Sequence, residues 1–174
     1  MEIQKTKLKN VLLFKPIIFN DFRGAYTEVF NEKDYFDKIK IILNKDVHFV
    51  TDSEVFSRKN VLRGLHGDDR TWKLFHCSKG TIYIVIVNCD LESESFGQWE
   101  SFELSAENKF QLLVPPKYGN GTLALNGDII FHYKQSEYYQ GAQNQFTYRF
   151  DDPKFNILWP INNSEIILSK RDDI

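Results

Sequence analysis

The sequence has little cysteine and no long apolar run. The first feature argues against a cysteine-based metal or redox site, and the second against a membrane-spanning protein. Only Cys77 and Cys89 occur among the 174 residues, and their spacing fits neither a zinc knuckle nor a redox Cys-x-x-Cys pair. The first ten residues, MEIQKTKLKN, contain no apolar signal segment, and no later run approaches the length of a membrane span. We therefore expect two buried thiols in a soluble, cytoplasmic protein without a membrane partner.

The sequence also lacks a strong net charge. Its 22 Lys and Arg residues and 24 Asp and Glu residues give a formal charge of −2, which argues against a general nucleic-acid binder. A local basic pocket does not require a basic protein, so an anionic small ligand is compatible with this balance. The chain does have 15 Phe, 8 Tyr and 3 Trp, which favour strands, and its length predicts one domain, 1–174, with a buried core.

Short apolar segments separated by turn residues predict an all-β protein. A first strand at 10–19 is interrupted at Pro16, and the sequence KYGNG at 117–121 is expected to be a loop because two prolines precede it. The rhythm is typical of a sandwich or small barrel, and a jelly-roll barrel fits best. The end of the chain, 167–174, is expected to pack across the barrel. Further strands are predicted at 25–30, 47–56, 73–77, 81–88, 99–104, 110–115, 121–125, 128–134 and 146–150.

One N-terminal helix is expected at 32–43, with the sequence EKDYFDKIKIIL. Asn31 precedes it and is a suitable N-cap, because its side chain can accept a hydrogen bond from a free backbone N–H of the first turn. Apolar residues recur at helical spacing and fall on one face. They are Tyr35, Phe36, Ile39, Ile42 and Leu43.

The segment NVLRGLHGDDRTWKL, residues 60–74, concentrates charged side chains in an apolar, strand-like setting. Singly, His66, Lys73 and Tyr133 have simple explanations as a structural histidine, a surface lysine and a core tyrosine. They lie in three different strand candidates, however, and the mouth of a jelly roll is a usual place for a ligand pocket. Arg23, in a turn after an aspartate, is most simply a surface ion pair, but together with the other three residues it would supply a base, an acid and cations for an enolate and a diphosphate.

A metal site is poorly supported by the same segment. Metal-binding barrels of this class need an H-x-H pair with further carboxylate and imidazole ligands, whereas the sequence here reads LHGD. The other three histidines show no such pairing with His66, and His66 with Asp68 alone would make a poor transition-metal site. We expect neither a metal nor a bound cofactor.

The chain resembles the nucleotide-diphospho-4-keto-6-deoxysugar 3,5-epimerase family. The resemblance rests on segments in the family's order and spacing: FNDFRGAYTEVFNEKDY, NVLRGLH, the long run from KLFHC to LLVPP, YYQG, ILWP and ILSKRD. It implies a cupin jelly roll that works without a metal or cofactor. It also implies a nucleotide-diphospho sugar as substrate and a homodimer that exchanges N-terminal strands.

The resemblance further implies roles for the residues that match. His66 corresponds to the catalytic base, and Asp172 to the carboxylate that orients this imidazole. Tyr133 corresponds to the acid on the opposite face of the sugar, and Lys73 to the cation beside the C4 carbonyl oxygen. The implied substrate and nucleotide contacts are Arg23, Glu28, Arg63, Thr51, Ser53, Asn120, Tyr138 and Arg171.

Departures from the family pattern fall at substrate contacts and leave the four catalytic positions unchanged. Asn120 stands where the family has His, Asp68 replaces a Gln, and Asn144 replaces a Glu. Arg171 replaces a Lys, and a Q-D-N segment reads TDS at 51–53. We interpret this as retained chemistry on an altered substrate. The combination LHGD, PP..GN, QFTY and LS.RD is most similar to the branch that acts on GDP-linked 4-keto heptoses in bacterial capsule synthesis, which favours that substrate over a dTDP-4-keto-6-deoxyhexose.

The expected reaction is inversion at C3, or at C3 and C5, through proton abstraction next to the C4 ketone. A 3,4-ketoisomerase is one alternative, although such relatives carry HAH where this chain reads HGD. A non-catalytic sugar-nucleotide binding module is another, but it would not need His66 and Tyr133 together with Asp172. A purely structural barrel would leave the clustered basic residues Arg23, Arg63 and Lys73 unexplained.

Overall fold

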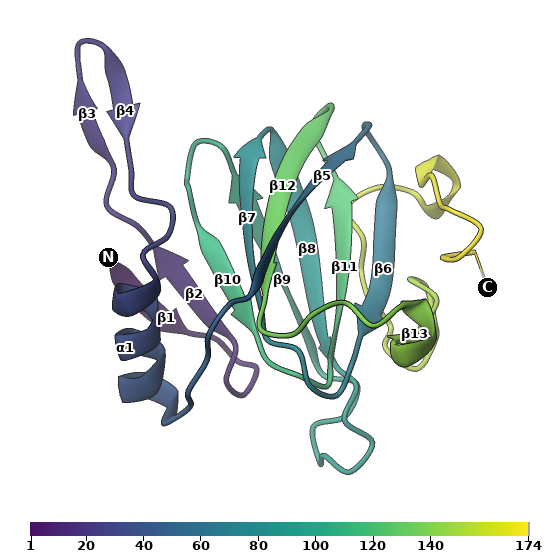
Figure 1. Ribbon diagram of the computed structural model, residues 1–174. Helices are drawn as coiled ribbons and strands as arrows, with labels where there is room; N and C mark the ends of the chain where they lie inside the picture. The colour runs from purple at the N-terminus through teal and green to yellow at the C-terminus, as the bar shows by residue number, and fades with distance from the viewer. Residues whose placement is uncertain (174) are drawn as a thin grey trace.

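The computed structural model describes residues 1–173 and shows two sheets packed face to face as a barrel (Figure 1). The six-stranded sheet has the order β1 (Glu2–Lys5), β2 (Leu12–Lys15), β10 (Gln111–Val114), β7 (Lys73–Lys79), β12 (Ile129–Gln135) and β5 (Thr51–Ser57). The five-stranded sheet has the order β13 (Phe146–Thr147), β6 (Leu62–Gly67), β11 (Tyr118–Ala124), β8 (Thr81–Asn88) and β9 (Trp99–Ser105). The prediction of an all-β jelly roll of the cupin type is confirmed.

The main core lies between the two sheets and follows from the alternation of side chains along each strand. Leu13, Phe75 and Leu112 point inward from the six-stranded sheet and meet Ile84 and Ile86 of β8. The opposite face of β8 is also buried, because the segment after β13 covers the five-stranded sheet from outside. This double burial explains why the sequence of β8 is apolar at nearly every position.

The predicted helix is confirmed as α1 (Glu32–Leu43). The side chain of Asn31 accepts a hydrogen bond from the backbone N–H of Asp34, which caps the first turn. Tyr35 and Ile39 are buried against Leu12 and Leu74 on the outer face of the six-stranded sheet. The helix therefore covers the outer face of the six-stranded sheet and contributes no side chain to the space between the two sheets.

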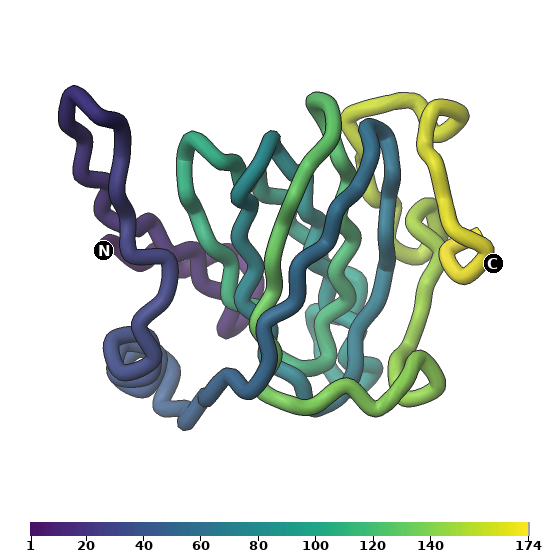
Figure 2. The backbone as a smooth tube through the Cα atoms, turned by 45° about the horizontal axis from the view of Figure 1, so that its top comes forward, coloured from purple at the N-terminus to yellow at the C-terminus, as the bar shows by residue number. Residues whose placement is uncertain are grey.

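A separate hairpin of β3 (Phe19–Asp21) and β4 (Gly24–Tyr26) projects from the barrel beside α1 (Figures 1 and 2). The predicted strand at 25–30 is therefore too long, since only its first two residues belong to β4, and no third strand continues the pairing. The predicted strand at 146–150 is likewise shortened to β13. In both segments apolar residues alternate over the predicted length, but the neighbouring strand pairs with only part of it, so the remaining residues do not belong to a strand.

The predicted loop at 117–121 is wrong, because Tyr118 to Gly121 belong to β11. This strand pairs with β6 on one side and with β8 on the other, so its backbone groups are satisfied even though it contains two glycines. The close approach of β6 requires one further glycine: a Cβ at Gly64 would lie 2.4 Å from the backbone oxygen of Asn120. Strand β1, whose sequence EIQK is half charged, was not predicted.

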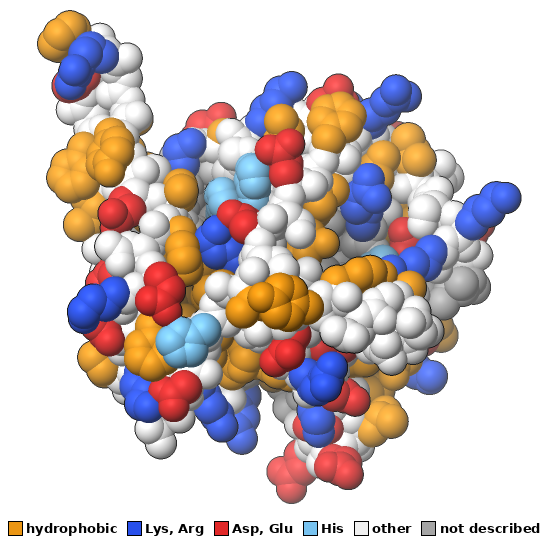
Figure 3. Space-filling model, viewed as in Figure 1, with side chains coloured by type: hydrophobic (Ala, Val, Ile, Leu, Met, Phe, Trp, Pro, Cys, Tyr) orange, Lys and Arg blue, Asp and Glu red, His pale blue; other side chains and the backbone are white. Residues whose placement is uncertain are grey.

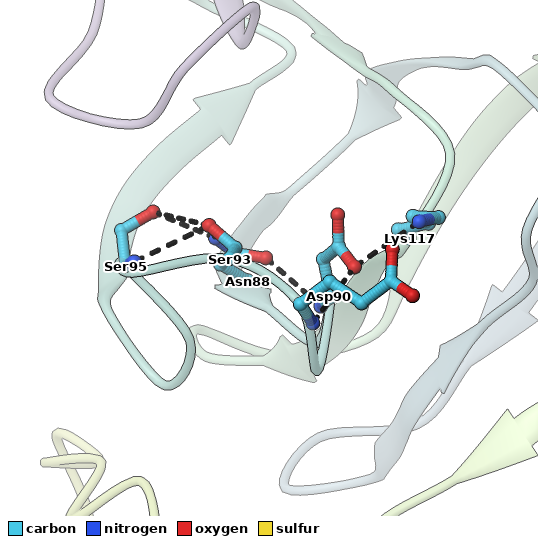
Figure 4. Close-up of polar contacts among 6 residues, drawn as sticks. Asn88, Asp90, Ser93, Ser95 and Lys117 are labelled. Atoms are coloured by element: carbon cyan, nitrogen blue, oxygen red, sulfur yellow. Dashed lines mark hydrogen bonds and ion pairs between the residues drawn. The ribbon is translucent and has the colours of Figure 1, made fainter.

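The loop between β8 and β9 is closed by its own side chains (Figure 4). The side-chain nitrogen of Asn88, Nδ2, donates hydrogen bonds to the hydroxyls of Ser93, at 3.0 Å, and Ser95, at 2.8 Å. A carboxylate oxygen of Asp90 forms a 3.1 Å ion pair with Lys117, which directly precedes β11. These contacts tie the end of β8 to the start of β11.

Both cysteines are buried free thiols, as expected. Burial raises the pKa of the Cys89 thiol to about 12, so this group stays protonated at neutral pH. Over residues 1–173, no helix combines the length and the apolar character needed to cross a bilayer.

Candidate active site

A cavity of about 420 Å³, here called the catalytic cavity, lies between the two sheets and brings the four expected catalytic residues together. Lys73 on β7 and Tyr133 on β12 reach it from the six-stranded sheet, and His66 on β6 reaches it from the five-stranded sheet. Asp172 enters from the C-terminal segment, which packs beside β6 as predicted (Figure 2). Figure 3 shows a hollow on this face, with basic, histidine and acidic side chains around it.

His66 is held by Asp172, whose carboxylate is almost fully buried. The Nε2 atom of His66 lies 2.7 Å from Oδ1 of Asp172, which satisfies the distance of an ion pair but not the alignment of a hydrogen bond. Burial opposes the charge of Asp172, but the contact with His66 and a 2.8 Å hydrogen bond from Ser169 outweigh it and lower the pKa of this carboxyl. Asp172 therefore stays anionic at neutral pH. A proton on Nε2 of His66 leaves the lone pair on Nδ1, which is then the basic atom.

Lys73 provides a buried cation on the other side of the cavity. Its Nζ donates a 3.0 Å hydrogen bond to the side-chain oxygen of Asn120, and only 6% of the residue is exposed. The pKa of Lys73 is lowered to about 8, mainly by burial; the negative charge of Asp68 opposes this shift, and the positive charge of Arg171 contributes to it. An ammonium group in this setting is poised to stabilise negative charge that develops on a substrate oxygen.

The pKa of Lys73 predicts an alkaline limit to activity. The group is charged below pH 8 and neutral above it, so kcat/KM should fall as the pH rises through about 8. Asp68→Asn should move this limb to lower pH, because the Asp68 carboxylate favours the ammonium form, while an Asn oxygen can still accept the backbone bonds from Arg70 and Thr71. The measurement is a pH profile of kcat/KM for both proteins. A profile that stays flat to pH 10 would contradict the role of Lys73.

Tyr133 lies across the cavity from His66, on the opposite sheet. Its ring packs against Phe75 and Phe131, with ring centroids 5.7 and 6.4 Å away. No hydrogen bond ties its hydroxyl to another group among residues 1–173. The ring is therefore positioned by apolar contacts, and the hydroxyl is available to a ligand.

Four of the predicted substrate contacts also line the catalytic cavity: Arg63, Ser53, Asn120 and Arg171. Arg63 is held by a 3.0 Å hydrogen bond to Ser57, and Arg171 by a 2.9 Å hydrogen bond to Gln145. Each guanidinium has five N–H donors, and these bonds, with those from Arg63 to the Phe56 carbonyl and from Arg171 to Thr147, leave some of them unused. Two guanidinium groups and one ammonium group around a single cavity suit an anionic ligand.

The other four predicted contacts do not line this cavity. Arg23 is on the projecting hairpin, where it forms a 2.6 Å ion pair with Asp21, and Glu28 follows the same hairpin. The hydroxyl of Thr51 is buried without a hydrogen-bond partner, and Tyr138 is 67% exposed beside a neighbouring cavity. Within one chain these four residues lie outside this cavity, and their contact with a substrate stays a prediction.

The sequence analysis missed several residues of the cavity wall. Strand alternation could have found some of them, because Phe75 lies two positions after Lys73, and Phe131 and Gln135 lie two positions on either side of Tyr133. Loop residues such as Tyr139 and Gln145 gave no such signal. The wall residues missed are Val55, Phe75, Thr122, Phe131, Gln135, Tyr139, Gln145 and Ser169.

The arrangement can remove a proton from carbon and return one to the opposite face. A base, an acid and a cation surround one cavity, and the cation can hold an enolate oxygen. Among residues 1–173, no group of three or more His, Cys, Asp or Glu side chains is placed to hold a metal ion. The remaining histidine pair, His76 and His132, is stacked with ring centroids 4.7 Å apart and does not line the catalytic cavity.

Fold and site together define a cupin-type isomerase that acts by epimerisation. The sequence model of one family, dTDP-4-dehydrorhamnose 3,5-epimerase, matches residues 5–174. The chain belongs to the dTDP-4-dehydrorhamnose 3,5-epimerase family.

Individual relatives agree with this assignment. The chain is 36% identical to dTDP-4-dehydrorhamnose 3,5-epimerase of Escherichia coli K12, over 99% of this chain and 92% of the relative. A crystal structure of the enzyme of that name from Elizabethkingia anophelis has a TM-score of 0.90 at 34% identity and covers 100% of this chain and 94% of its own. A Legionella pneumophila epimerase solved with dTDP-4-keto-L-rhamnose has a TM-score of 0.89 at 33% identity, covering 99% and 89%.

Proposed function

We propose that the chain inverts C3, or C3 and C5, of a nucleotide-diphospho-4-keto sugar. The observation that carries this proposal is the placement of His66 and Tyr133 on opposite walls of one cavity, with Lys73 beside them. An epimerase needs these groups because the proton must leave one face of a carbon and return to the other. A non-catalytic binding module would have no use for this opposition.

In the proposed reaction, Nδ1 of His66 takes the proton from the carbon next to the C4 ketone. The electron pair of the C–H bond moves into the ring to form an enolate, whose oxygen is stabilised by the ammonium group of Lys73. The Tyr133 hydroxyl then donates its proton to the opposite face of the carbon, and the ketone re-forms. Asp172 stabilises the imidazolium that exists between the two steps.

We further propose a GDP-linked 4-keto heptose as the substrate, with a dTDP-linked 4-keto-6-deoxyhexose as the alternative. The names of the relatives favour the alternative, since they specify dTDP sugars. The motifs LHGD and PP..GN favour the heptose. Among the residues that differ from the family pattern, Asn120 is the one that contacts a proposed catalytic residue. Its side chain contacts Lys73 where the family has a histidine, so the neighbour of the cation is altered.

We propose that the active unit is a homodimer in which the β3–β4 hairpin of one copy contacts the other. The hairpin exposes large apolar side chains, with Phe19 60%, Phe22 98% and Tyr26 65% exposed. Such aromatic groups on a projecting arm suit burial against a partner. Exchange of this arm would carry Arg23 and Glu28 toward the cavity of the second copy, which accounts for their absence from the cavity of their own chain.

Deuterium incorporation tests the proposed reaction. The protein is incubated in D2O with GDP-linked 4-keto heptose and, separately, with dTDP-linked 4-keto-6-deoxyhexose, and deuterium is located by NMR. We expect deuterium at C3, or at C3 and C5, with the faster reaction on the heptose. Faster turnover of the dTDP sugar would overturn the heptose assignment alone. Deuterium at no ring carbon of either sugar would exclude epimerisation.

A further inference from the structure

Gln135 is a buried polar residue that the reaction described above does not use. The residue is 6% exposed, and no hydrogen bond within residues 1–173 ties its side-chain amide to another group. The amide is not among the fully buried atoms without a partner, and the residue lines a cavity, so the amide is accessible to a ligand there. It is the last residue of β12, where its Cα pairs directly with that of Lys73 on β7. Side chains of such a pair lie next to each other on one face of the sheet. The unpaired amide is therefore an immediate neighbour of the cation that faces the C4 oxygen.

Gln135 also stands at a junction between two cavities. The catalytic cavity adjoins a second cavity of about 330 Å³, and Gln135, Tyr139 and Gln145 line both. This second cavity forms where β6 and β12 end and the chain after β12 crosses from one sheet to the other (Figure 1). Its further walls include the aromatic ring of Tyr138 and the charged or amide side chains of Asp69, Glu137, Gln140 and Asn144.

The strand register orders the groups along the catalytic cavity. Arg63, near the start of β6, pairs with Thr122, whereas His66, near its end, pairs with Asn120. On the other sheet, Tyr133 is followed by Gln135 toward the second cavity. A ligand in this cavity therefore meets Arg63 first, His66 next, and Lys73 with Gln135 last.

A pyranose fits this order in one direction. Its diphosphate is on C1 and its ketone is on C4, which lies across the ring from C1. With the diphosphate at Arg63 and the C4 oxygen at Lys73, the two adjacent carbons, C3 and C5, lie on either side of Lys73. Its polar neighbours are Asn120 and Gln135. Gln135 lines the second cavity and Asn120 does not, so the longer substituent, the exocyclic arm on C5, is assigned to Gln135.

We propose that Gln135 is a specificity residue that hydrogen-bonds a hydroxyl on the exocyclic arm of the sugar, and that the second cavity takes the end of that arm. The inference rests on the proposed function, since it assumes a C4 ketone held at Lys73. An amide that faces a cavity can exchange its water for a sugar hydroxyl, whereas a methyl group that displaces the water leaves the amide without a hydrogen-bond partner. The carboxylates and amides of the second cavity suit a polar arm for the same reason. The site would therefore select a sugar with a hydroxylated arm, as in a heptose, over a 6-deoxyhexose.

The test compares ligands that bind without reacting. Dissociation constants for GDP, a GDP-linked 6-deoxyhexose and a GDP-linked heptose, both with a hydroxyl at C4, are measured by calorimetry for wild type and Gln135→Met. Methionine keeps the length of the side chain but removes the amide. We expect Gln135→Met to weaken heptose binding about tenfold, the effect of one lost hydrogen bond, and to change the other two ligands less than about twofold.

Two further variants keep the test decisive. Glu137→Met alters only an exposed residue of the second cavity. It removes a polar group from the cavity wall and should also weaken heptose binding alone, even where Gln135→Met fails to fold. Gln143→Met, at an exposed position outside both cavities, is the matched control and should bind all three ligands as wild type does.

The outcomes separate this inference from the proposed reaction. Equal weakening of all three ligands by Gln135→Met, or no weakening of any, would overturn the role of Gln135. Weakening of GDP itself would place the nucleotide base, instead of the sugar arm, in the second cavity and would overturn it too. Selective loss of heptose binding in a protein that incorporates no deuterium would support Gln135 and contradict the epimerase reaction.

Discussion

Replacing His66 with asparagine is expected to abolish proton abstraction. Asparagine is close in size and polar, but its amide cannot accept a proton at neutral pH, so neither inverted product nor deuterated substrate should form. The rate should fall by about 10⁴-fold, the upper end of the range for loss of a general base. The measurement is NMR of the sugar after incubation in D2O, alongside product formation by chromatography.

The control for this variant is His48→Asn. His48 is exposed, contacts Glu32 near the start of α1, and lies outside the catalytic cavity, so the rate should not change. Asp172→Asn should give an intermediate loss, because it leaves the imidazole in place but removes the charge that stabilises imidazolium. Exchange at a near wild-type rate in His66→Asn would show that another group is the base.

Replacing Tyr133 with phenylalanine is expected to separate proton removal from inversion. The base and the cation remain, so the enolate should still form and take its proton back from the imidazolium on the face it left. Inverted product should fall by about 10² to 10⁴-fold, the usual range for loss of one general acid. Deuterium incorporation should fall less steeply, since it depends on exchange of the imidazolium proton with solvent.

The matched control here is Tyr148→Phe, because Tyr148 packs on the outer face of the five-stranded sheet and does not line the cavity. Inversion near the wild-type rate by a correctly folded Tyr133→Phe protein would assign the acid to another group. Tyr139 is the first candidate for that role, since it also lines the catalytic cavity, whereas Tyr138 does not.

The comparison of sequence and structure is clearest at individual elements. The bounds predicted for the helix at 32–43 and for the strand at 81–88 agree with α1 and β8. A side-chain cap and a pattern of apolar residues are properties of a few neighbouring residues, so they can be read locally. The prediction of a loop at 117–121 failed because the strand there depends on pairing with strands that are distant in the sequence. The two prolines before this segment do end one strand, but the next strand follows them almost directly, because two neighbouring strands accept and donate its hydrogen bonds.

The sequence by itself determined the all-β class, the helix and the family, and it indicated four candidate catalytic residues, His66, Asp172, Tyr133 and Lys73, that line one cavity. Only the tertiary structure decided which residues share a cavity, because sheet register and the path of the C-terminal segment bring distant residues together. It placed Asp172 against His66 and Asn120 against Lys73, and it put Gln135 at the entrance to a second cavity. The tertiary structure also places Arg23 and Glu28 on or beside the projecting hairpin, outside the catalytic cavity of their own chain. Local sequence patterns carry no information on such contacts, since these depend on the packing of one sheet against the other.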